Sequence, residues 1–254
     1  MSEAPMIEVE NLTLRFGGLV AVNDLSLVVR PRTIHALIGP NGAGKSTTFN
    51  CISRLYRPTS GRIRVLGRDV SGLRPQDLAP LGVARTFQNL ELFGGLSVLE
   101  NVLIGAHVHC GGGLRERLAA RPPAVIGHVE HLLERVGLAE FRHAQASALD
   151  FGRQKMLELA RALAIRPRIL LLDEPAAGLR NREIGALDRL LNELVERDGL
   201  TVLLVEHVMQ LVMAISHRVT VMNFGARIAE GTPAEVRRDP LVVEAYLGQE
   251  AAHA

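Results

Sequence analysis

The sequence predicts an α/β fold with a helical lobe inserted into it, and two observations carry this prediction. Short, almost wholly apolar runs at residues 34–38, 169–172 and 201–205 are typical of parallel strands that are covered on both faces. Strand patterns vanish between residues 97 and 138, where helical patterns take over. We therefore expect both ends of the chain to form an α/β core, with the helical lobe between them.

Composition narrows the class of protein. The chain has 254 residues, 47% of them hydrophobic, which suits one large domain or a core with a smaller lobe. A net charge of +2 gives no reason to expect a nucleic-acid partner, and two cysteines suggest no disulfide framework. No run approaches the about 20 apolar residues that span a bilayer, and the N-terminus lacks an export signal. We expect a soluble intracellular protein.

The N-terminal elements follow from alternation and turn residues. Residues 7–14 alternate apolar and polar side chains, as a half-buried strand does, and residues 25–29 predict a second strand. The buried strand at 34–38 leads into a glycine-rich loop, and a helix begins after it. A turn at residues 58–61 then precedes a strand at 62–67.

The middle of the chain is predicted to change from strand to helix. Residues 83–88 have the pattern of a strand with a polar end, and residues 89–96 form an unusually apolar loop. Ser97 with Glu100 three residues later forms a capping-box pattern, which predicts a helix start. A flexible break is expected around residues 111–113 and 121–123, followed by a second helix through Val136.

The C-terminal half is predicted to return to α/β structure. A helix is expected at residues 149–163, and an amphipathic helix around residues 188–194 is expected to pack on the sheet. Strands at residues 169–172, 201–205, 219–223 and 227–230 close the core.

The loop after residue 38 fits the phosphate-loop pattern G-x-x-x-x-G-K-[ST] at every fixed position. Its glycines let successive N–H groups point into one anion-sized hollow, and the helix that follows adds unpaired donors and the positive end of its dipole. Lys45 is expected to reach the outer phosphates, and the Ser46 hydroxyl to ligate Mg²⁺. The sequence thus predicts a nucleoside triphosphate site at Gly39, Pro40, Asn41, Gly42, Ala43, Gly44, Lys45, Ser46 and Thr47.

Polar residues that follow the buried strands are the candidates for chemistry. Asp173 can hold the Mg²⁺ shell that bridges the outer phosphates, and Glu174 can orient or deprotonate an attacking water. His207, past the neighbouring strand, is a candidate for contact with the γ-phosphate, although a lone histidine is more often a satisfied core residue. Phe16, just upstream of the loop, is either a base-stacking aromatic or a core residue.

The order of these features along the chain is recognisable. Over nearly its whole length, the sequence resembles the nucleotide-binding subunits of ATP-binding cassette (ABC) transporters. The resemblance includes Phe16, the phosphate loop, Gln88, the segment that opens the helix at 149–163, the acids at the end of the strand and His207. Within the superfamily the sequence is most similar to ATPases of branched-chain amino-acid importers, on residues 15–21, 84–89, 173–179, 229–233 and 244–248. Urea importers and lipopolysaccharide-export ATPases look much alike.

The resemblance implies a P-loop NTPase (RecA-like) core with a mixed sheet, an N-terminal antiparallel β subdomain and an inserted α-helical subdomain. All would lie in one ATP-binding domain over residues 1–254, with a core at about 1–88 and 155–254 and the helical subdomain at about 89–154. It further implies an ATPase that uses ATP and Mg²⁺. Its catalytic residues would be Lys45, Glu174 and His207, and its metal ligands Ser46, Gln88 and Asp173.

The resemblance also implies partners. Two such ATPase subunits face each other head to tail, with each ATP between one subunit's phosphate loop and the other's signature segment. Transmembrane permease subunits would be contacted near residues 88–93, which gives exposed Leu92 and Phe93 a purpose. The chain would then be peripheral to the cytoplasmic face of the membrane. It would couple ATP hydrolysis to import of branched-chain amino acids or a similar small polar solute.

The sequence departs from the family in the signature segment. Where the family has Leu-Ser-Gly-Gly-Gln, this chain has an aspartate, Asp150, in place of the serine, followed by Phe151, Gly152 and Arg153. A carboxylate cannot donate to a γ-phosphate, although Asp150 is an excellent N-cap for the helix that follows. Asp150 and Gly152 are therefore candidate nucleotide contacts across the interface, and a heterodimer with one strong and one weak site would accommodate the change.

The sequence also allows an alternative function of a different class. A soluble ABC-type switch protein, not attached to a transporter, would act in nucleic-acid or ribosome work. The sequence offers neither a second cassette nor a basic stripe to support it.

Overall fold

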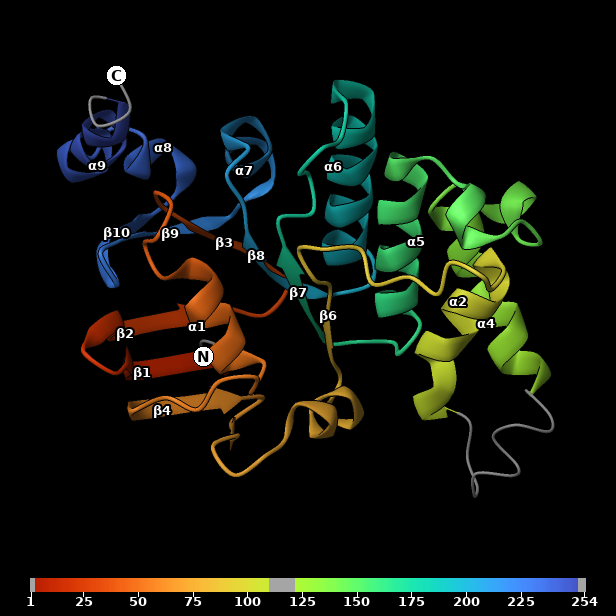
Figure 1. Cartoon of the computed structure of the whole chain (residues 1–254), viewed down its shortest axis with the longest axis horizontal. Coiled ribbons are helices and arrows are strands. Elements are labelled where there is room, and N and C mark those ends of the chain that lie inside the picture. The colour runs from red at the N-terminus through yellow and green to blue at the C-terminus, as the bar shows by residue number, and fades with distance from the viewer. Residues whose placement is uncertain (1–2, 110–121, 251–254) are drawn as a thin grey trace.

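The computed structural model describes residues 3–109 and 122–250, and two β-sheets organise it (Figure 1). The flexible break expected around residues 111–113 lies outside the described residues. An antiparallel sheet lies at one end of the molecule, and the helices of the predicted inserted lobe lie at the other end. Within the described ranges, no helix is both long and apolar enough to cross a bilayer.

The smaller sheet has the strand order β2-β1-β4-β5 and is antiparallel. The first two strands are longer than predicted, because β1 runs on to Phe16 and β2 begins directly after the Gly17–Gly18 turn. Shifts in register between the two strands break the simple alternation that the sequence pattern relies on. The strands are β1 (Ile7–Phe16), β2 (Leu19–Val29), β4 (Ser60–Val65) and β5 (Arg68–Asp69).

The larger sheet is mixed, as expected, with the strand order β10-β9-β3-β8-β7-β6. Neighbouring strands from β9 to β6 run parallel, and only β10 is antiparallel to its neighbour. The predicted strands at 34–38 and 201–205 have the expected bounds. The strands are β3 (Ile34–Ile38), β6 (Val83–Arg85), β7 (Ile169–Asp173), β8 (Thr201–Val205), β9 (Arg218–Asn223) and β10 (Ala226–Gly231).

Both faces of this sheet are buried, which explains the continuous apolar runs. Leu170 and Leu172 of β7 point into one core, and Ile169 and Leu171 into the other. The second core also holds Phe49 of α1 (Lys45–Ile52) and the inner face of the antiparallel sheet, so α1 lies between the two sheets. The helix that follows the phosphate loop is thereby fixed on two sides.

Helices cover the other face of the mixed sheet. The amphipathic pattern expected around residues 188–194 belongs to α6 (Asn181–Glu196), whose leucines enter the first core. Helix α7 (Met209–Ile215) packs beside it. At the C-terminal end, α8 (Pro233–Val236) and α9 (Pro240–Glu250) lie against β10.

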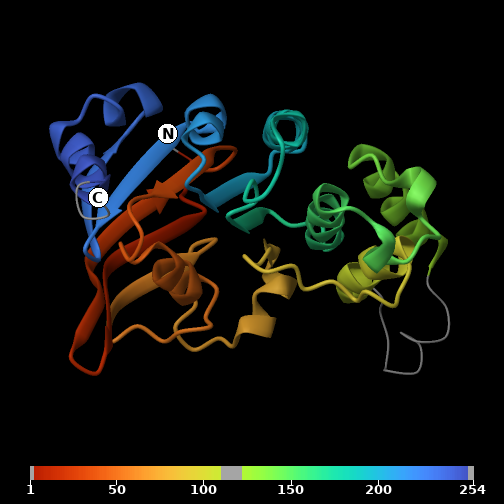
Figure 2. The ribbon, with the colours of Figure 1, turned by 45° about the horizontal axis from the view of Figure 1, so that its top comes forward.

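The predicted helical lobe consists of helices that pack on one another. Helix α2 (Val98–Gly105) begins with the expected capping box of Ser97 and Glu100, and it packs on α4 (Pro123–Arg135) and α5 (Phe151–Leu163). Figure 2 shows these helices set to one side of the sheets. The division into a core at about 1–88 and 155–254 and a helical subdomain at about 89–154 stays our interpretation.

Candidate functional site

The phosphate loop joins the buried end of β3 to the first turn of α1, and its shape depends on glycine. Gly39 has a φ of 148°, and a Cβ there would lie 2.1 Å from the carbonyl oxygen of Met222. Gly44, with a φ of 97°, caps α1. The loop borders a cavity of about 510 Å³ that is lined by residues 41–47. Backbone N–H groups at the start of a helix beside such a cavity favour an anion.

Lys45 lies inside this loop. Its Nζ donates to the carbonyl oxygens of Gly39, at 2.7 Å, and Pro40, at 2.9 Å. Burial lowers the pKa of the Lys45 ammonium, against the opposing influence of Glu174 and Asp173. Two backbone acceptors and two nearby carboxylates thus hold a cation at the cavity, where a polyphosphate would meet it.

Asp173 is the last residue of β7 and Glu174 follows it, at the edge of the sheet where β3 also ends. Glu174 lines the cavity together with the phosphate loop. Its backbone N–H donates to Val205 at 2.9 Å, and it has a φ of 48°, an unusual conformation for a residue other than glycine. Asp173 is buried and pairs with Arg85 at 3.0 Å. Burial raises the pKa of the Asp173 carboxyl, and Arg85 acts in the opposite direction.

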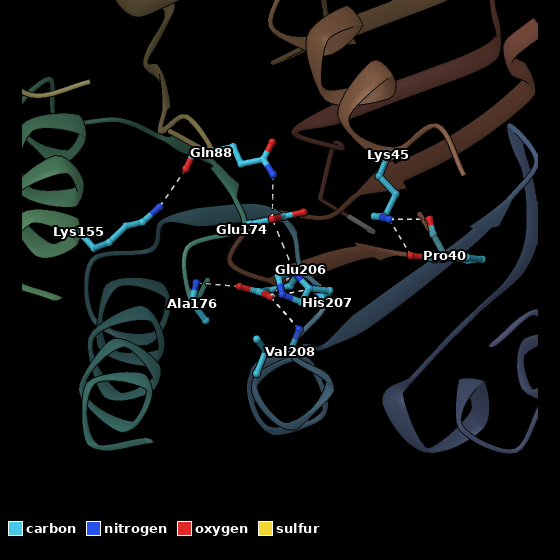
Figure 3. A network of polar contacts seen from close by, with 10 residues as sticks. Pro40, Lys45, Gln88, Lys155, Glu174, Ala176, Glu206, His207 and Val208 are labelled. Atoms are coloured by element: carbon cyan, nitrogen blue, oxygen red, sulfur yellow. Dashed lines mark hydrogen bonds and ion pairs between the residues drawn. The ribbon is translucent and has the colours of Figure 1, made fainter. Parts of the chain in front are cut away.

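Gln88 and His207 both reach Glu174 (Figure 3). The Gln88 Nε2 donates to Glu174 Oε2 at 3.1 Å, and Lys155 Nζ donates to the Gln88 backbone oxygen at 3.3 Å. His207 Nδ1 lies 3.7 Å from the same Glu174 oxygen, and its side chain is 56% exposed. His207 is therefore not a core histidine. The geometry places an amide and an imidazole on one carboxylate.

Glu206, which the sequence analysis missed, holds together the two loops that carry Glu174 and His207. Its side chain is fully buried, and it accepts from the backbone N–H groups of Ala176 at 2.8 Å, His207 at 2.7 Å and Val208 at 2.9 Å. One carboxylate thus joins the loop that follows β7 to the loop that follows β8 (Figure 3). An acid directly after a buried strand was the available signal.

Aromatic side chains stand at the rim of the cavity. Phe16 lines it, is 47% exposed and makes an edge-to-face contact with Tyr56, with ring centroids 5.4 Å apart. The core alternative for Phe16 is therefore wrong. Phe224, which the sequence analysis missed, also lines the cavity and is 88% exposed. Its turn is tied to the loop because Gly225 N donates to Ala43 O at 3.0 Å.

The donor set fits a magnesium ion shared with phosphates. Ser46 and Gln88 line the cavity, and the Oδ1 atom of Asp173 is buried without a hydrogen-bond partner. Mg²⁺ prefers oxygen ligands and usually keeps waters and substrate phosphates in its shell, so one or two protein oxygens suffice. Within the described residues, no three or more His, Cys, Asp or Glu side chains form a cluster that could hold a metal ion.

Asp150 and Gly152 do not belong to the lining of this cavity. Asp150 is the N-cap of α5, as predicted, and its Oδ1 accepts from the Arg153 backbone N–H at 2.9 Å. The Arg153 guanidinium pairs with the same carboxylate and lies over the Phe141 ring. At Gly152, a Cβ would meet a carboxylate oxygen of Glu183 at 2.2 Å.

The loop expected to meet a membrane subunit borders a groove of about 360 Å³ between the sheet and the helices. Phe93 lines this groove and is 50% exposed, while Arg161 lies over its ring. The expectation that Leu92 is exposed is wrong, because this side chain is partly buried and packs on the hydrophobic core.

The structure brings most of the predicted residues together and leaves a few outside. Gly39 and Pro40 do not line the cavity, but their carbonyl oxygens accept from Lys45, which does line it. Outside the lining also lie Asp173, His207, Asp150 and Gly152. The predicted residues that do line it are Phe16, Asn41, Gly42, Ala43, Gly44, Lys45, Ser46, Thr47, Gln88 and Glu174.

Comparisons with known proteins identify the family. The profile of the ABC transporter family matches residues 22–177, and that of the branched-chain amino acid ATP-binding cassette transporter matches residues 226–252. The chain is 47% identical over 251 residues to the high-affinity branched-chain amino acid transport ATP-binding protein LivG of Salmonella typhimurium, covering 96% of this chain and 98% of that protein. Its identity to the corresponding protein BraF of Pseudomonas aeruginosa is 45%, with the same coverage.

Solved structures show the same architecture. An ATP-binding cassette of an ABC transporter in its ADP conformation has a TM-score of 0.87 at 30% identity, covering 97% of this chain and 100% of that one. A dimeric bacterial ABC transporter cassette has a TM-score of 0.78 at 26% identity, covering 90% and 99% of the two chains. Together with the phosphate loop and with Glu174, which lines the same cavity, these similarities show that this chain belongs to the ABC transporter family, as one of its ATP-binding, ATP-hydrolysing cassettes.

Proposed function

We propose that this chain binds ATP with Mg²⁺ in the cavity of about 510 Å³ and hydrolyses it to drive the import of branched-chain amino acids or a similar small polar solute. One observation carries the catalytic part: Glu174 lines the same cavity as the phosphate loop and is bonded to Gln88. The identity of the solute is proposed from sequence similarity, since the relatives LivG and BraF are branched-chain amino acid transport ATP-binding proteins.

Each residue has a role that its position supports. Lys45 and the loop amides bind the outer phosphates, and Phe16 stacks on the base. Ser46, Gln88 and Asp173 would hold the metal ion, which would neutralise phosphate charge when bound.

Glu174 orients and deprotonates the water that attacks the γ-phosphate. His207, 3.7 Å from Glu174, holds that carboxylate and reaches toward the same phosphate.

Two variants test the catalytic assignment. Glu174→Gln should retain ATP affinity but lose hydrolysis by about 100-fold or more, because general-base catalysis contributes about 10²–10⁴-fold. Lys45→Ala should lose ATP binding itself. Hydrolysis at the wild-type rate by Glu174→Gln would contradict the assignment.

The partners are a second ATPase subunit and transmembrane permease subunits. The groove beside residues 88–93 is the proposed contact for a permease segment, because its rim carries the half-exposed Phe93 and it lies next to Gln88. Such a contact would hold the chain at the cytoplasmic face of the membrane. Purification of the native complex tests this: a co-purifying hydrophobic subunit supports it, whereas strong salt-sensitive RNA or DNA binding would favour the soluble switch protein.

The partner ATPase is proposed to be a paralogue rather than a second copy. Asp150 offers a carboxylate where the family has a serine, and Arg153 pairs with it. A like-charge contact with a γ-phosphate is unfavourable by a few kcal/mol at about 4 Å and an effective dielectric near 20. A homodimer would carry this defect twice. Asp150→Ser in the assembled pair should raise ATP affinity or the hydrolysis rate, and no change in either would remove the proposal.

A further inference from the structure

Arg85 is a buried cation beside Asp173, the acid that ends β7. It is the last residue of β6, and its Nη2 donates to Asp173 Oδ2 at 3.0 Å. The two side chains are only 10% and 5% exposed. No established role in the site requires this arginine, and its charge in a short apolar strand calls for a physical explanation.

Three further contacts fix the guanidinium. It lies over the Phe49 ring, 5.4 Å from its centroid, and over the Phe87 ring at 5.0 Å. Its Nη1 donates to the Ser53 hydroxyl. Phe49 and Ser53 belong to α1 and its C-cap, and Phe87 directly precedes Gln88. The arginine is thus held by the helix behind the phosphate loop and by the segment that carries Gln88.

The contact uses only one oxygen of the carboxylate. Oδ2 of Asp173 accepts from Arg85, whereas Oδ1 is buried without a hydrogen-bond partner. A buried polar atom that lacks a partner is unfavourable and rare in folded proteins, and a functional site is one of the usual reasons for it. The ion pair therefore fixes the carboxylate through Oδ2 and leaves Oδ1 without a hydrogen-bond partner.

We propose that Arg85 is a positioning residue, which fixes the Asp173 carboxylate through Oδ2 so that Oδ1 meets the Mg²⁺ of the bound nucleotide. This inference rests on the proposed function, because it assigns a role toward the metal of MgATP. The planar guanidinium suits the task because its donors are held in a fixed fork, whereas a lysine ammonium is a single flexible point charge.

The test measures how much Mg²⁺ strengthens nucleotide binding. The ADP affinity of the whole chain is determined by calorimetry with Mg²⁺ and again with EDTA, and the ratio of the two is the magnesium benefit. Partners that orient a metal ligand typically contribute about 10–100-fold to metal affinity. Arg85→Met should therefore reduce the magnesium benefit by about 10-fold or more, and leave the affinity in EDTA within about twofold of wild type.

Arg161→Met is the matched control. Arg161, like Arg85, lines the groove of about 360 Å³ and lies over a phenylalanine ring, but its guanidinium donates to the backbone oxygen of Glu91 instead of to Asp173. Its magnesium benefit should equal that of wild type. Thermal unfolding of every variant monitors folding. If Arg85→Met does not fold, Arg85→Lys takes its place, and its magnesium benefit should fall below wild type.

A double variant asks whether Arg85 acts through Asp173. In the wild-type background Asp173→Asn should reduce the magnesium benefit, and in the Arg85→Met background it should reduce it little further. An undiminished magnesium benefit in Arg85→Met, equal losses with and without Mg²⁺, or additive losses in the double variant would overturn the inference. Failure of the wild-type chain to bind nucleotide in either condition would instead overturn the proposed function.

Discussion

Glu206 joins the loops that carry Glu174 and His207, and its replacement by glutamine tests whether this buried carboxylate holds the site. The change keeps size and shape but turns one of the two acceptor oxygens into a donor. Glu206 accepts three backbone N–H groups, and both of its oxygens are used. In Glu206→Gln at least one of these N–H groups, on Ala176, His207 or Val208, must therefore face an NH₂ group.

The size of the effect follows from these bonds. A hydrogen bond to a charged group contributes about 1.5–3 kcal/mol, and a buried unsatisfied donor costs about 1–3 kcal/mol. We expect the free energy of unfolding to fall by about 2–5 kcal/mol. For a domain of this size, each kcal/mol lowers Tm by about 2–4 °C, so Tm should fall by about 4–20 °C.

Urea denaturation and calorimetry measure these quantities, and a hydrolysis assay at a permissive temperature reports on the site. Glu10→Gln is the control, since Glu10 pairs with Arg64 at an exposed position and its loss should change stability by less than about 1 kcal/mol. A Tm for Glu206→Gln within about 2 °C of wild type corresponds to a loss of at most about 1 kcal/mol, and it would refute the reasoning.

Three further predictions address the base, the loop and pH. Phe16→Ala should weaken ATP binding by about 5–150-fold, because stacking of a base on an aromatic side chain contributes about 1–3 kcal/mol. Tripolyphosphate binding, which involves no base, should be unchanged, and an equal loss for both ligands would contradict stacking. Gly39→Ala should abolish nucleotide binding and lower Tm, because its Cβ would lie 2.1 Å from the Met222 carbonyl oxygen; a variant that binds ATP normally would disprove this steric requirement. Burial lowers the pKa of His35 to about 4 from the model-compound value of 6.5. The contribution of neutral His35 to the free energy of unfolding is therefore fully present above the unfolded pKa of 6.5. As pH falls from 6.5 toward 4, the free energy of unfolding should fall by up to about 3 kcal/mol, at about 1.36 kcal/mol per pKa unit. His35→Gln, which retains a partner for Thr220, should flatten the dependence of urea midpoints on pH, and a slope equal to wild type would show that His35 is not the group responsible.

The centre of the site was predictable because its signals are local. The phosphate-loop pattern fixes which residues curl around an anion. Apolar runs that end in Asp173–Glu174 identify the edge of the sheet where the acids must lie. The N-cap role of Asp150 is equally local, because a short polar side chain before a helix satisfies an N–H three residues later.

The residues that were missed act through contacts between distant segments. Arg85 and Asp173 are 88 positions apart, and the partners of Glu206 lie after two different strands. A charged residue within or directly after an apolar strand was the only local sign of either. Such a sign shows that a partner must exist but does not identify it.

Element boundaries failed where the chain departs from regular alternation. The start of β2 was hidden because shifts in register put polar residues such as Asn23 and Asp24 inside a strand. The strand predicted at 83–88 ends at Arg85, because the Phe87 N–H turns to the Glu158 carboxylate instead of a neighbouring strand. Leu92 was expected to be exposed because it lies in an apolar loop predicted to meet a membrane subunit, whereas it packs on the hydrophobic core.

The most direct test of the whole account is a structure of the Glu174→Gln chain, assembled with its partner, in the presence of ATP and Mg²⁺. The account predicts a triphosphate along residues 39–47 with the base against Phe16. It also predicts a metal ion between Ser46, Gln88 and Oδ1 of Asp173. A nucleotide bound elsewhere, or a metal ion that leaves Asp173 turned away and paired only with Arg85, would contradict it.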